Sequence, residues 1–276
     1  SYNSQIGVPL SVWLLNEQSQ VGVFEAGISE PGEMQALRGI IQPDIAVLTF
    51  IGDAHQKNFS SLEEKCREKV VLFHDTKTIV YCKDDEVVDR VVRSVGYKGE
   101  NLAWSMRDRS AALFVESVEK KGLTSTIHYI YNDEAGEYVL PFIDEASVRN
   151  SVTTAVVALH LGLSREHLAE RMASLEPVAM RLEVKEGQKG CTLINDSYNS
   201  DINSLDIALD FMNRRPDHKG RKRTLILSDI YQTGEPLDVL YKEVSDLSVQ
   251  RGVEKIIGIG PQIMEHADLI KVQEKY

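Results

Sequence analysis

The sequence has little cysteine: three thiols in 276 residues, and no two of them form a C-x-x-C pair. That spacing excludes the common zinc-finger and dithiol redox motifs. We therefore expect Cys66, Cys82 and Cys191 to be reduced, as in a cytoplasmic protein. Long apolar runs are missing as well. No stretch approaches the ~20 residues that cross a bilayer, and no signal-peptide pattern opens the chain, so membrane insertion is not expected.

Positive charge is in deficit. Asp and Glu number 42 against 31 Lys and Arg, which gives a formal net charge of −11. An acidic protein is repelled by the phosphates of nucleic acids and of anionic membranes, so we expect no nucleic-acid partner. A basic run at residues 214–223 has no interleaved aromatic side chains and is expected to be a solvated loop.

What the sequence does contain is a regular alternation of short apolar runs and amphipathic segments in its first hundred residues. Strands are predicted at 21–26, 44–51 and 78–82, and helices at 8–15, 34–41, 60–73 and 84–95. Ser29 is expected to cap the helix at 34–41, and Ser60 or Ser61 the helix at 60–73. This alternation predicts an α/β fold with a mostly parallel sheet covered by helices.

The pattern changes twice further along the chain. Three β-rich stretches, with a turn at residues 132–136, predict a small antiparallel meander, at 111–118, 125–131 and 137–141. Helices at 147–161 and 165–174 follow it. A fresh alternation of strands and helices after Pro177 then predicts a second, Rossmann-like unit. We place the domain boundary there, with domains at 1–176 and 177–276.

Two polar residues stand at the ends of predicted strands. Glu25 ends the apolar run at 21–24, and His55 follows the run at 45–51. Residues just past the carboxyl ends of parallel strands line the ligand crevice of an open sheet, so these two side chains can share a metal ion. Each also has a plainer interpretation: Glu25 as a helix-capping or solvated acid, and His55 as a structural loop residue.

Six stretches in collinear order resemble the Mur ligase family. They are residues 3–10, 25–33, 43–47, 52–55, 196–199 and 227–235. Together they extend over nearly the whole chain, which makes the resemblance specific although each motif is weak alone. It is strongest to the ligases that join D-alanyl-D-alanine to UDP-MurNAc-tripeptide in peptidoglycan precursor synthesis.

The resemblance implies a central ATPase domain followed by a Rossmann-like C-terminal domain. It also implies an ATP-dependent, amide-forming ligase that works through an acyl phosphate, with ATP and Mg²⁺ as cofactors. A related ligase that joins glutamate to folate is an alternative, although residues 3–9 argue against it. An interaction module that binds nucleotides without chemistry is the alternative from another class, and the pair Glu25 and His55 argues against that.

Two departures from the family pattern stand out. The chain has no Gly-Lys dipeptide, so it lacks the lysine of the ATP-binding P-loop. We therefore expect a fragment without the N-terminal domain and P-loop, truncated in its C-terminal domain and inactive by itself. The family's His-Asn pair reads Ala146-Ser147 here. A ligase fused ahead of an alanine racemase is similar in this respect, which predicts a possible covalent fusion to alanine racemase.

The resemblance also assigns roles to residues of the first domain. Glu25, His55 and Lys69 match metal-site positions, and Lys69 matches a lysine that is carbamylated in several Mur ligases. Its plainer interpretation is a solvated helix lysine. Asn3 and Ser4 match the segment that contacts the tripeptide, and they can also cap the helix that follows. A further nucleotide-binding position, which a helix cap would explain nearly as well, is Asn150.

In the second domain the resemblance assigns nucleotide contacts to Arg181 and Asp196, and substrate contacts to Tyr198 and Asn199. Arg181, with His55 and Lys69, is also placed among the catalytic residues. A linker salt bridge would account for Arg181, and a strand-to-helix turn would account for the other three. Asp229 follows another strand with a weaker signal and is left outside the predicted site.

Overall fold

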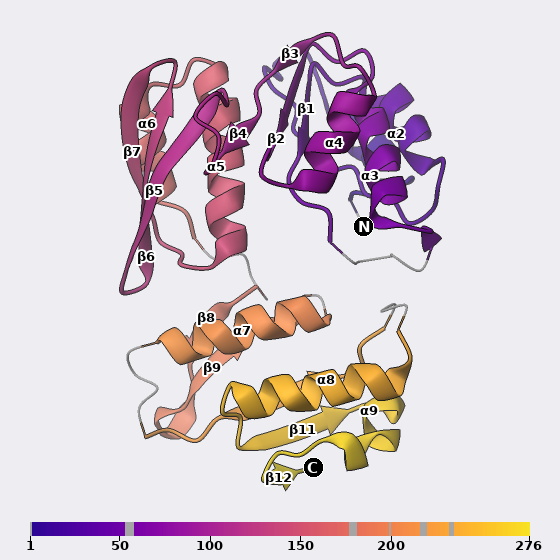
Figure 1. Cartoon of the computed structure of the whole chain (residues 1–276), viewed down its shortest axis with the longest axis vertical. Coiled ribbons are helices and arrows are strands. Elements are labelled where there is room, and N and C mark those ends of the chain that lie inside the picture. Colours follow the sequence, from indigo (N-terminus) through magenta and orange to yellow (C-terminus); the bar gives the residue numbers. More distant parts are fainter. Residues whose placement is uncertain (1, 53–57, 177–180, 199, 216–219, 232–234) are drawn as a thin grey trace. The chain divides into compact units, whose positions relative to one another are not determined.

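The computed structural model describes residues 2–52, 58–176, 181–198, 200–215, 220–231 and 235–276. The chain divides into two compact units, one built mainly from residues up to Ser174 and the other mainly from Leu175–Tyr276. Both units mix helices with parallel and small antiparallel sheets, so the expected α/β class is confirmed (Figure 1). Among the described residues, none of the helices has both the length and the apolarity to cross a membrane.

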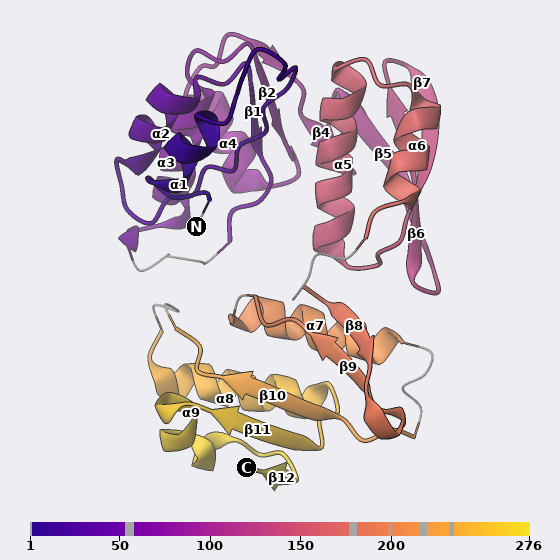
Figure 2. The same ribbon diagram turned by 180° about the vertical axis from the view of Figure 1, so that it is seen from behind.

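The first unit contains a parallel sheet with the order β1-β2-β3, made of Ile45–Leu48, Thr78–Tyr81 and Glu100–Asn101. Ile45 lies opposite Thr78, and Leu48 lies opposite Tyr81. All four residues of β2 are buried, as expected for a parallel strand covered on both faces. Figures 1 and 2 show the surrounding helices α2, α3 and α4, at Glu33–Ile41, Leu62–Val70 and Glu86–Ser94.

A second sheet of the same unit has the order β4-β5-β6-β7, at Trp104–Ser105, Leu113–Lys121, Thr124–Tyr131 and Glu134–Leu140. A parallel bridge between Cys82 and Trp104 links β4 to the end of β2. Helices α5 (Glu145–His160) and α6 (Arg165–Ala173) follow. The indole N–H of the fully buried Trp104 donates to the Thr153 hydroxyl on α5 at 2.9 Å, which ties this helix to the sheet.

Two predicted details of this unit are wrong. The turn between β6 and β7 contains only Asn132 and Asp133, because Tyr131 already pairs with Glu134. Both turn residues have positive φ, 52° and 60°, as two-residue hairpins require, and Asn and Asp tolerate that conformation. The expected strand at 21–26 has no regular structure, and Val23 is 91% exposed. A strand needs a neighbour for its backbone N–H and C=O groups, and no described strand lies beside this segment.

The starts of α3 and α4 follow local signals, whereas the start of α2 depends on a tertiary contact. Ser61 caps α3 by accepting from the Glu64 N–H at 3.1 Å, as predicted, and Asp85 caps α4 from Val88 at 3.2 Å. The predicted serine cap of α2 is wrong. The N–H groups of Gly32 and Met34 instead donate to the Glu68 carboxylate of α3, at 2.9 and 3.1 Å.

The second unit begins with an antiparallel pair, β8 and β9, at Glu183–Glu186 and Thr192–Asn195. Its parallel sheet has the order β10-β11-β12, at Thr224–Ser228, Lys255–Ile259 and Glu274–Lys275. Helices α7 (Ile202–Arg214), α8 (Leu237–Gln250) and the short α9 (Pro261–Glu265) complete it. Leu205, Leu240, Val244 and Ile256 belong to one buried cluster that joins α7, α8 and the sheet.

Asp229, directly after β10, has a structural role in this unit. Its carboxylate is buried and accepts the N–H groups of Ile263 and Gln262 at 2.9 and 3.2 Å. The hydroxyls of Tyr231 and Tyr241 donate to it at 3.3 and 3.5 Å. Burial alone would raise the pKa of Asp229, but these donors outweigh burial and hold the pKa below its usual range. Asp229 therefore fixes the start of α9 against the end of β10.

Replacing Asp229 with alanine is expected to lower the free energy of unfolding by about 1–3 kcal/mol, because it leaves two buried N–H groups without an acceptor. The stabilisation by Asp229 is present above the carboxyl pKa of the unfolded chain and is lost as pH falls through the lower folded pKa. Urea titrations at neutral and acidic pH should show the difference between wild type and variant shrinking in acid. Equal stability of Asp229→Ala and the exposed control Asp268→Ala at neutral pH would contradict this role.

Candidate active site

The structure brings three of the predicted site residues of the first unit together. The Asn3 side-chain amide donates to Glu25 Oε1 at 2.8 Å, and the Asn3 carbonyl accepts the Gly27 N–H, also at 2.8 Å. A side chain at Gly27 would crowd Asn3, since its Cβ would lie 3.1 Å from the Asn3 amide nitrogen. Glycine at position 27 thus permits the backbone approach that aims Asn3 at Glu25.

Lys69 joins this pair from helix α3. Burial lowers the pKa of its ammonium group, and the Glu25 carboxylate lies near enough to oppose that shift. Lys69 is half-buried, and burial has the largest effect on its pKa, so its environment differs from that of a fully solvated helix lysine. A lowered pKa also leaves more of the amine neutral near pH 7, the form that reacts with carbon dioxide. His55, the other predicted metal-site residue, lies outside the described residues.

Sequence reasoning missed a second lysine on the same helix. Lys65 is buried, and its ammonium group donates to the Gly52 carbonyl at the end of the segment that follows β1. A buried ammonium is costly unless it is paired, so this contact fixes the chain where it enters the 52–55 motif. The spacing of four residues from Lys69, which places both on one helix face, is the signal that could have found it.

Ser4 has the capping role that the sequence left open. Its hydroxyl accepts the Gly7 N–H at 3.0 Å, at the start of α1 (Gly7–Val12). Asn3 and Ser4 are therefore oriented by local and tertiary hydrogen bonds at once. Asn150 is exposed and lies inside α5, more than one turn from its first residue, so the helix-cap interpretation of Asn150 is wrong.

The donor set near Glu25 is compatible with Mg²⁺. Magnesium is usually held by one or two carboxylates, with waters and substrate phosphates as the other ligands. Glu25 offers a carboxylate, and Asn3 fixes one of its two oxygens while the other stays available. Within the described ranges there is no cluster of three or more His, Cys, Asp or Glu side chains that could hold a metal. Among the described residues Glu25 is therefore a single candidate ligand, and a magnesium site here would need further ligands.

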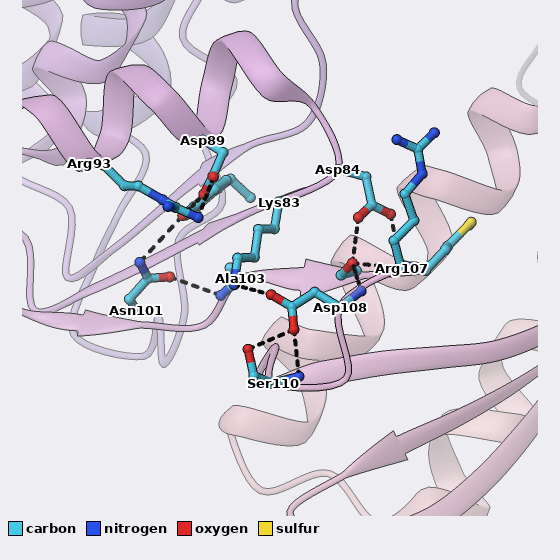
Figure 3. A network of polar contacts seen from close by, with 12 residues as sticks. Lys83, Asp84, Asp89, Arg93, Asn101, Ala103, Arg107, Asp108 and Ser110 are labelled. Atoms are coloured by element: carbon cyan, nitrogen blue, oxygen red, sulfur yellow. Dashed lines mark hydrogen bonds and ion pairs between the residues drawn. The ribbon is translucent and has the colours of Figure 1, made fainter.

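A polar network holds the neighbouring strand ends, after β2 and β4 (Figure 3). The Asp84 carboxylate accepts the Ser105 hydroxyl and the Met106 N–H. The Ser105 hydroxyl oxygen in turn accepts the N–H groups of Arg107 and Asp108, at 2.9 and 2.8 Å. An ion pair with Lys83 holds the pKa of Asp108 well below its usual range. The Arg107 guanidinium extends away from this turn (Figure 3).

In the second unit three predicted residues gather after β9. The Arg181 guanidinium lies 4.3 Å from the centre of the Tyr198 ring, and the Leu182 N–H donates to Asp196 Oδ1 at 3.0 Å. Burial raises the pKa of Asp196, while this hydrogen bond and the charge of Arg181 oppose the rise. Asn199 lies outside the described residues. A cation, a carboxylate and an aromatic ring thus lie close together here, from Arg181, Asp196 and Tyr198.

The order of these groups along the chain is that of a known family. Residues 1–158 match the Mur ligase middle domain. The chain belongs to the Mur ligase family. Glu25, His55, Lys69 and Asn150 all lie within the part that matches the Mur ligase middle domain, whereas Arg181, Asp196 and Tyr198 lie beyond it.

Sequence relatives also align with the second unit of this chain. A UDP-N-acetylmuramoyl-tripeptide–D-alanyl-D-alanine ligase of Bacillus subtilis is 24% identical over 267 residues, which cover 94% of this chain and 55% of that ligase. The ligase of the same name from Borreliella burgdorferi is 25% identical over 284 residues, covering 99% and 58%. The chain thus spans a little more than half the length of these Mur ligases.

Solved Mur ligases share the fold. A D-alanyl-D-alanyl ligase of this type from Acinetobacter baumannii aligns over the whole chain and 59% of its own length, with a TM-score of 0.82 at 19% identity. The MurF ligase of Thermotoga maritima in complex with ADP aligns over 98% of this chain and 61% of its own, with a TM-score of 0.77 at 21% identity. At such identities the likeness shows the fold alone, which is that of the Mur ligases.

Proposed function

We propose that this chain is the central and C-terminal part of an ATP-dependent ligase that joins D-alanyl-D-alanine to UDP-MurNAc-tripeptide in the cytoplasm. The contact of Asn3 with Glu25, together with the half-buried Lys69 whose charge interacts with Glu25, carries the proposal. These three residues come from separate segments, and each stands where the family resemblance assigns a substrate or metal-site role. The named relatives, which are ligases of this substrate pair, support the same reaction.

During the proposed reaction negative charge accumulates on the phosphoryl oxygens. ATP phosphorylates the terminal carboxylate of the tripeptide, the amine of D-alanyl-D-alanine attacks the acyl phosphate, and phosphate leaves. Mg²⁺, held by Glu25 and His55, would supply positive charge to the phosphoryl oxygens. Asn3 holds the Glu25 carboxylate in one orientation through its amide, and Ser4, by starting α1, fixes the segment on which Asn3 lies. Lys65 holds the backbone that leads to His55.

Lys69 has one of two states in this site. As an ammonium it would neutralise a phosphoryl oxygen beside Glu25. As a carbamate it would become an anion able to hold a metal. Its partial burial supports the carbamate, because burial disfavours the charged amine and favours the nucleophilic neutral form, although the Glu25 charge opposes that shift.

The second unit supplies further contacts. Arg181 offers a planar fork of donors for nucleotide phosphate, and Tyr198 orients it by stacking. Asp196, whose burial disfavours its charged form, is positioned to accept from a hydroxyl or an amine of the nucleotide. Tyr198 and Asn199 would meet the dipeptide. Asn150, exposed on α5, is free to contact the adenine.

We also propose that the whole protein carries an alanine racemase in the same chain, which the Ala146-Ser147 variation supports.

The 276-residue chain alone is expected to show no ATP-dependent ligation, whereas the full-length ligase that contains it should release phosphate only when both UDP-MurNAc-tripeptide and D-alanyl-D-alanine are present. The reason is the missing lysine and backbone amides of the P-loop. Phosphate release and product mass would be measured for both proteins, with glutamate plus folate as the control substrate pair. Turnover of the short chain near the full-length rate would contradict the missing P-loop. Ligation of glutamate to folate would contradict the proposed substrates.

A further inference from the structure

Arg149, on helix α5, lies where three parallel strands end. Its guanidinium carbon is 5.7 Å from the ring centre of Phe50, just after β1, and 6.0 Å from the ring of Trp104 in β4. Burial raises the pKa of Cys82, just after β2, and the charge of Arg149 opposes that rise. The carboxyl ends of parallel strands form the edge at which open α/β sheets bind ligands. Arg149 therefore brings a positive charge to the ligand edge of this sheet.

The hydrogen-bonding capacity of Arg149 is largely unused. A guanidinium carries five N–H donors. Its contact with a carboxylate, Glu145 on the same helix, is 3.9 Å long, which is beyond hydrogen-bonding distance. Its Nε is buried and has no hydrogen-bond partner in the part of the chain that the structure describes. The Arg149 side chain is 23% exposed, so its terminal N–H groups can reach an acceptor from outside these residues.

Arg165 of the same unit differs from Arg149 in its terminal N–H groups, although its Nε is likewise buried without a partner among the described residues. Its guanidinium is 2.7 Å from the Glu134 carboxylate and donates to the Tyr131 carbonyl at 2.9 Å. A purely structural arginine thus ends on protein acceptors in this fold. Arg149 instead ends on two aromatic rings, which hold the plane of its guanidinium and leave the N–H edge unpaired.

The ring of Phe50 gives a second, independent indication. It is 60% exposed, although large apolar side chains beside a sheet are normally covered. An exposed aromatic ring and a half-covered cation at a ligand edge suit a ligand with a charged part. Guanidinium groups bind phosphate oxygens with two parallel hydrogen bonds.

We propose that Arg149 binds the phosphate groups of the nucleotide, with Phe50 and Trp104 holding its guanidinium in place. This inference rests on the proposed function, in which the nucleotide is ATP, and adds a residue that the motifs did not indicate. The signal was absent from the sequence, because α5 presents Arg149 as an ordinary helix arginine four residues after a glutamate.

The test uses the full-length ligase and measures the Kd values of ADP and of adenosine by titration calorimetry. Arg149→Met removes the charge but keeps an unbranched apolar stem between the two rings, and Arg149→Lys keeps the charge without the planar fork. Arg149→Met is expected to weaken ADP about tenfold or more, while adenosine binding changes less than twofold, with Arg149→Lys between them. The exposed Arg90, which pairs with Glu63 on another helix, gives the matched control Arg90→Met.

ADP binding to Arg149→Met with wild-type affinity would overturn the inference. Equal weakening of ADP and adenosine would also overturn it, because the contact would then involve the base or the fold. If Arg149→Met melts below assay temperature, the ratio of ADP to adenosine affinity in Arg149→Lys decides. A wild-type protein that binds ADP but does not join D-alanyl-D-alanine would refute the proposed function and leave this inference standing. Failure of the wild type to bind ADP would refute both.

Discussion

Replacing Lys69 with alanine in the full-length ligase is expected to lower turnover by about 100- to 1,000-fold, the usual cost of losing one charged group at a reacting centre. Lys69 is half-buried and its charge interacts with that of Glu25, so alanine removes a positive charge near this carboxylate and leaves a gap there. If Lys69 acts as a carbamate, short carboxylic acids such as acetate should enter that gap and restore part of the rate. Phosphate release with and without acetate would measure both effects.

A control variant and a spectroscopic measurement separate the two states of Lys69. The exposed control Lys77→Ala, which removes an ammonium paired with Asp44, should keep the wild-type rate and show no response to acetate. Labelled bicarbonate should give a carbamate signal by carbon-13 NMR in the wild type and none in Lys69→Ala. An equal loss of rate without any rescue would place Lys69 in the site as an ammonium. A wild-type rate in Lys69→Ala would remove it from the site.

Replacing Glu25 with glutamine is expected to reduce turnover by about 100-fold or more and to raise the magnesium concentration needed for half-maximal rate. Glutamine keeps an oxygen that accepts from the Asn3 amide, so the variant removes the charge while preserving the hydrogen bond. Since the Glu25 carboxylate supports the charged form of Lys69, its loss should also lower the pKa of Lys69 further. Magnesium titrations of the initial rate would provide the measurement.

The exposed neighbour Glu30 supplies the control, because Glu30→Gln removes a negative charge from the same segment without touching Asn3. His55→Ala should behave like Glu25→Gln if the two residues share the ion. Normal magnesium titrations in both Glu25→Gln and His55→Ala would exclude them as ligands. A defect in Glu25→Gln alone would separate Glu25 from His55.

The family resemblance singled out Glu25 and Lys69. The structure joins Glu25 to Asn3 by a hydrogen bond, and the charge of Glu25 acts on Lys69. Arg149 and the network around Asp84 were not found. Their partners lie 21 or more residues away along the chain, and neither has a pattern that sequence spacing can reveal. The strand expected before Glu25 failed for a related reason, because an apolar run becomes a strand only beside a partner.

By itself the sequence determined the α/β class and the helices whose first turn carries its own acceptor. Ser61 and Asp85 each accept a backbone N–H three residues ahead, an interaction that needs no other part of the chain. Only the tertiary structure decided the start of α2, which Glu68 caps across 36 and 34 residues, and the contact of Asn3 with Glu25 across 22. These acceptors reach their donors only after the helices have packed on the sheet. The geometry of the site therefore results from that packing, although the sequence already shows the residue types that could form it.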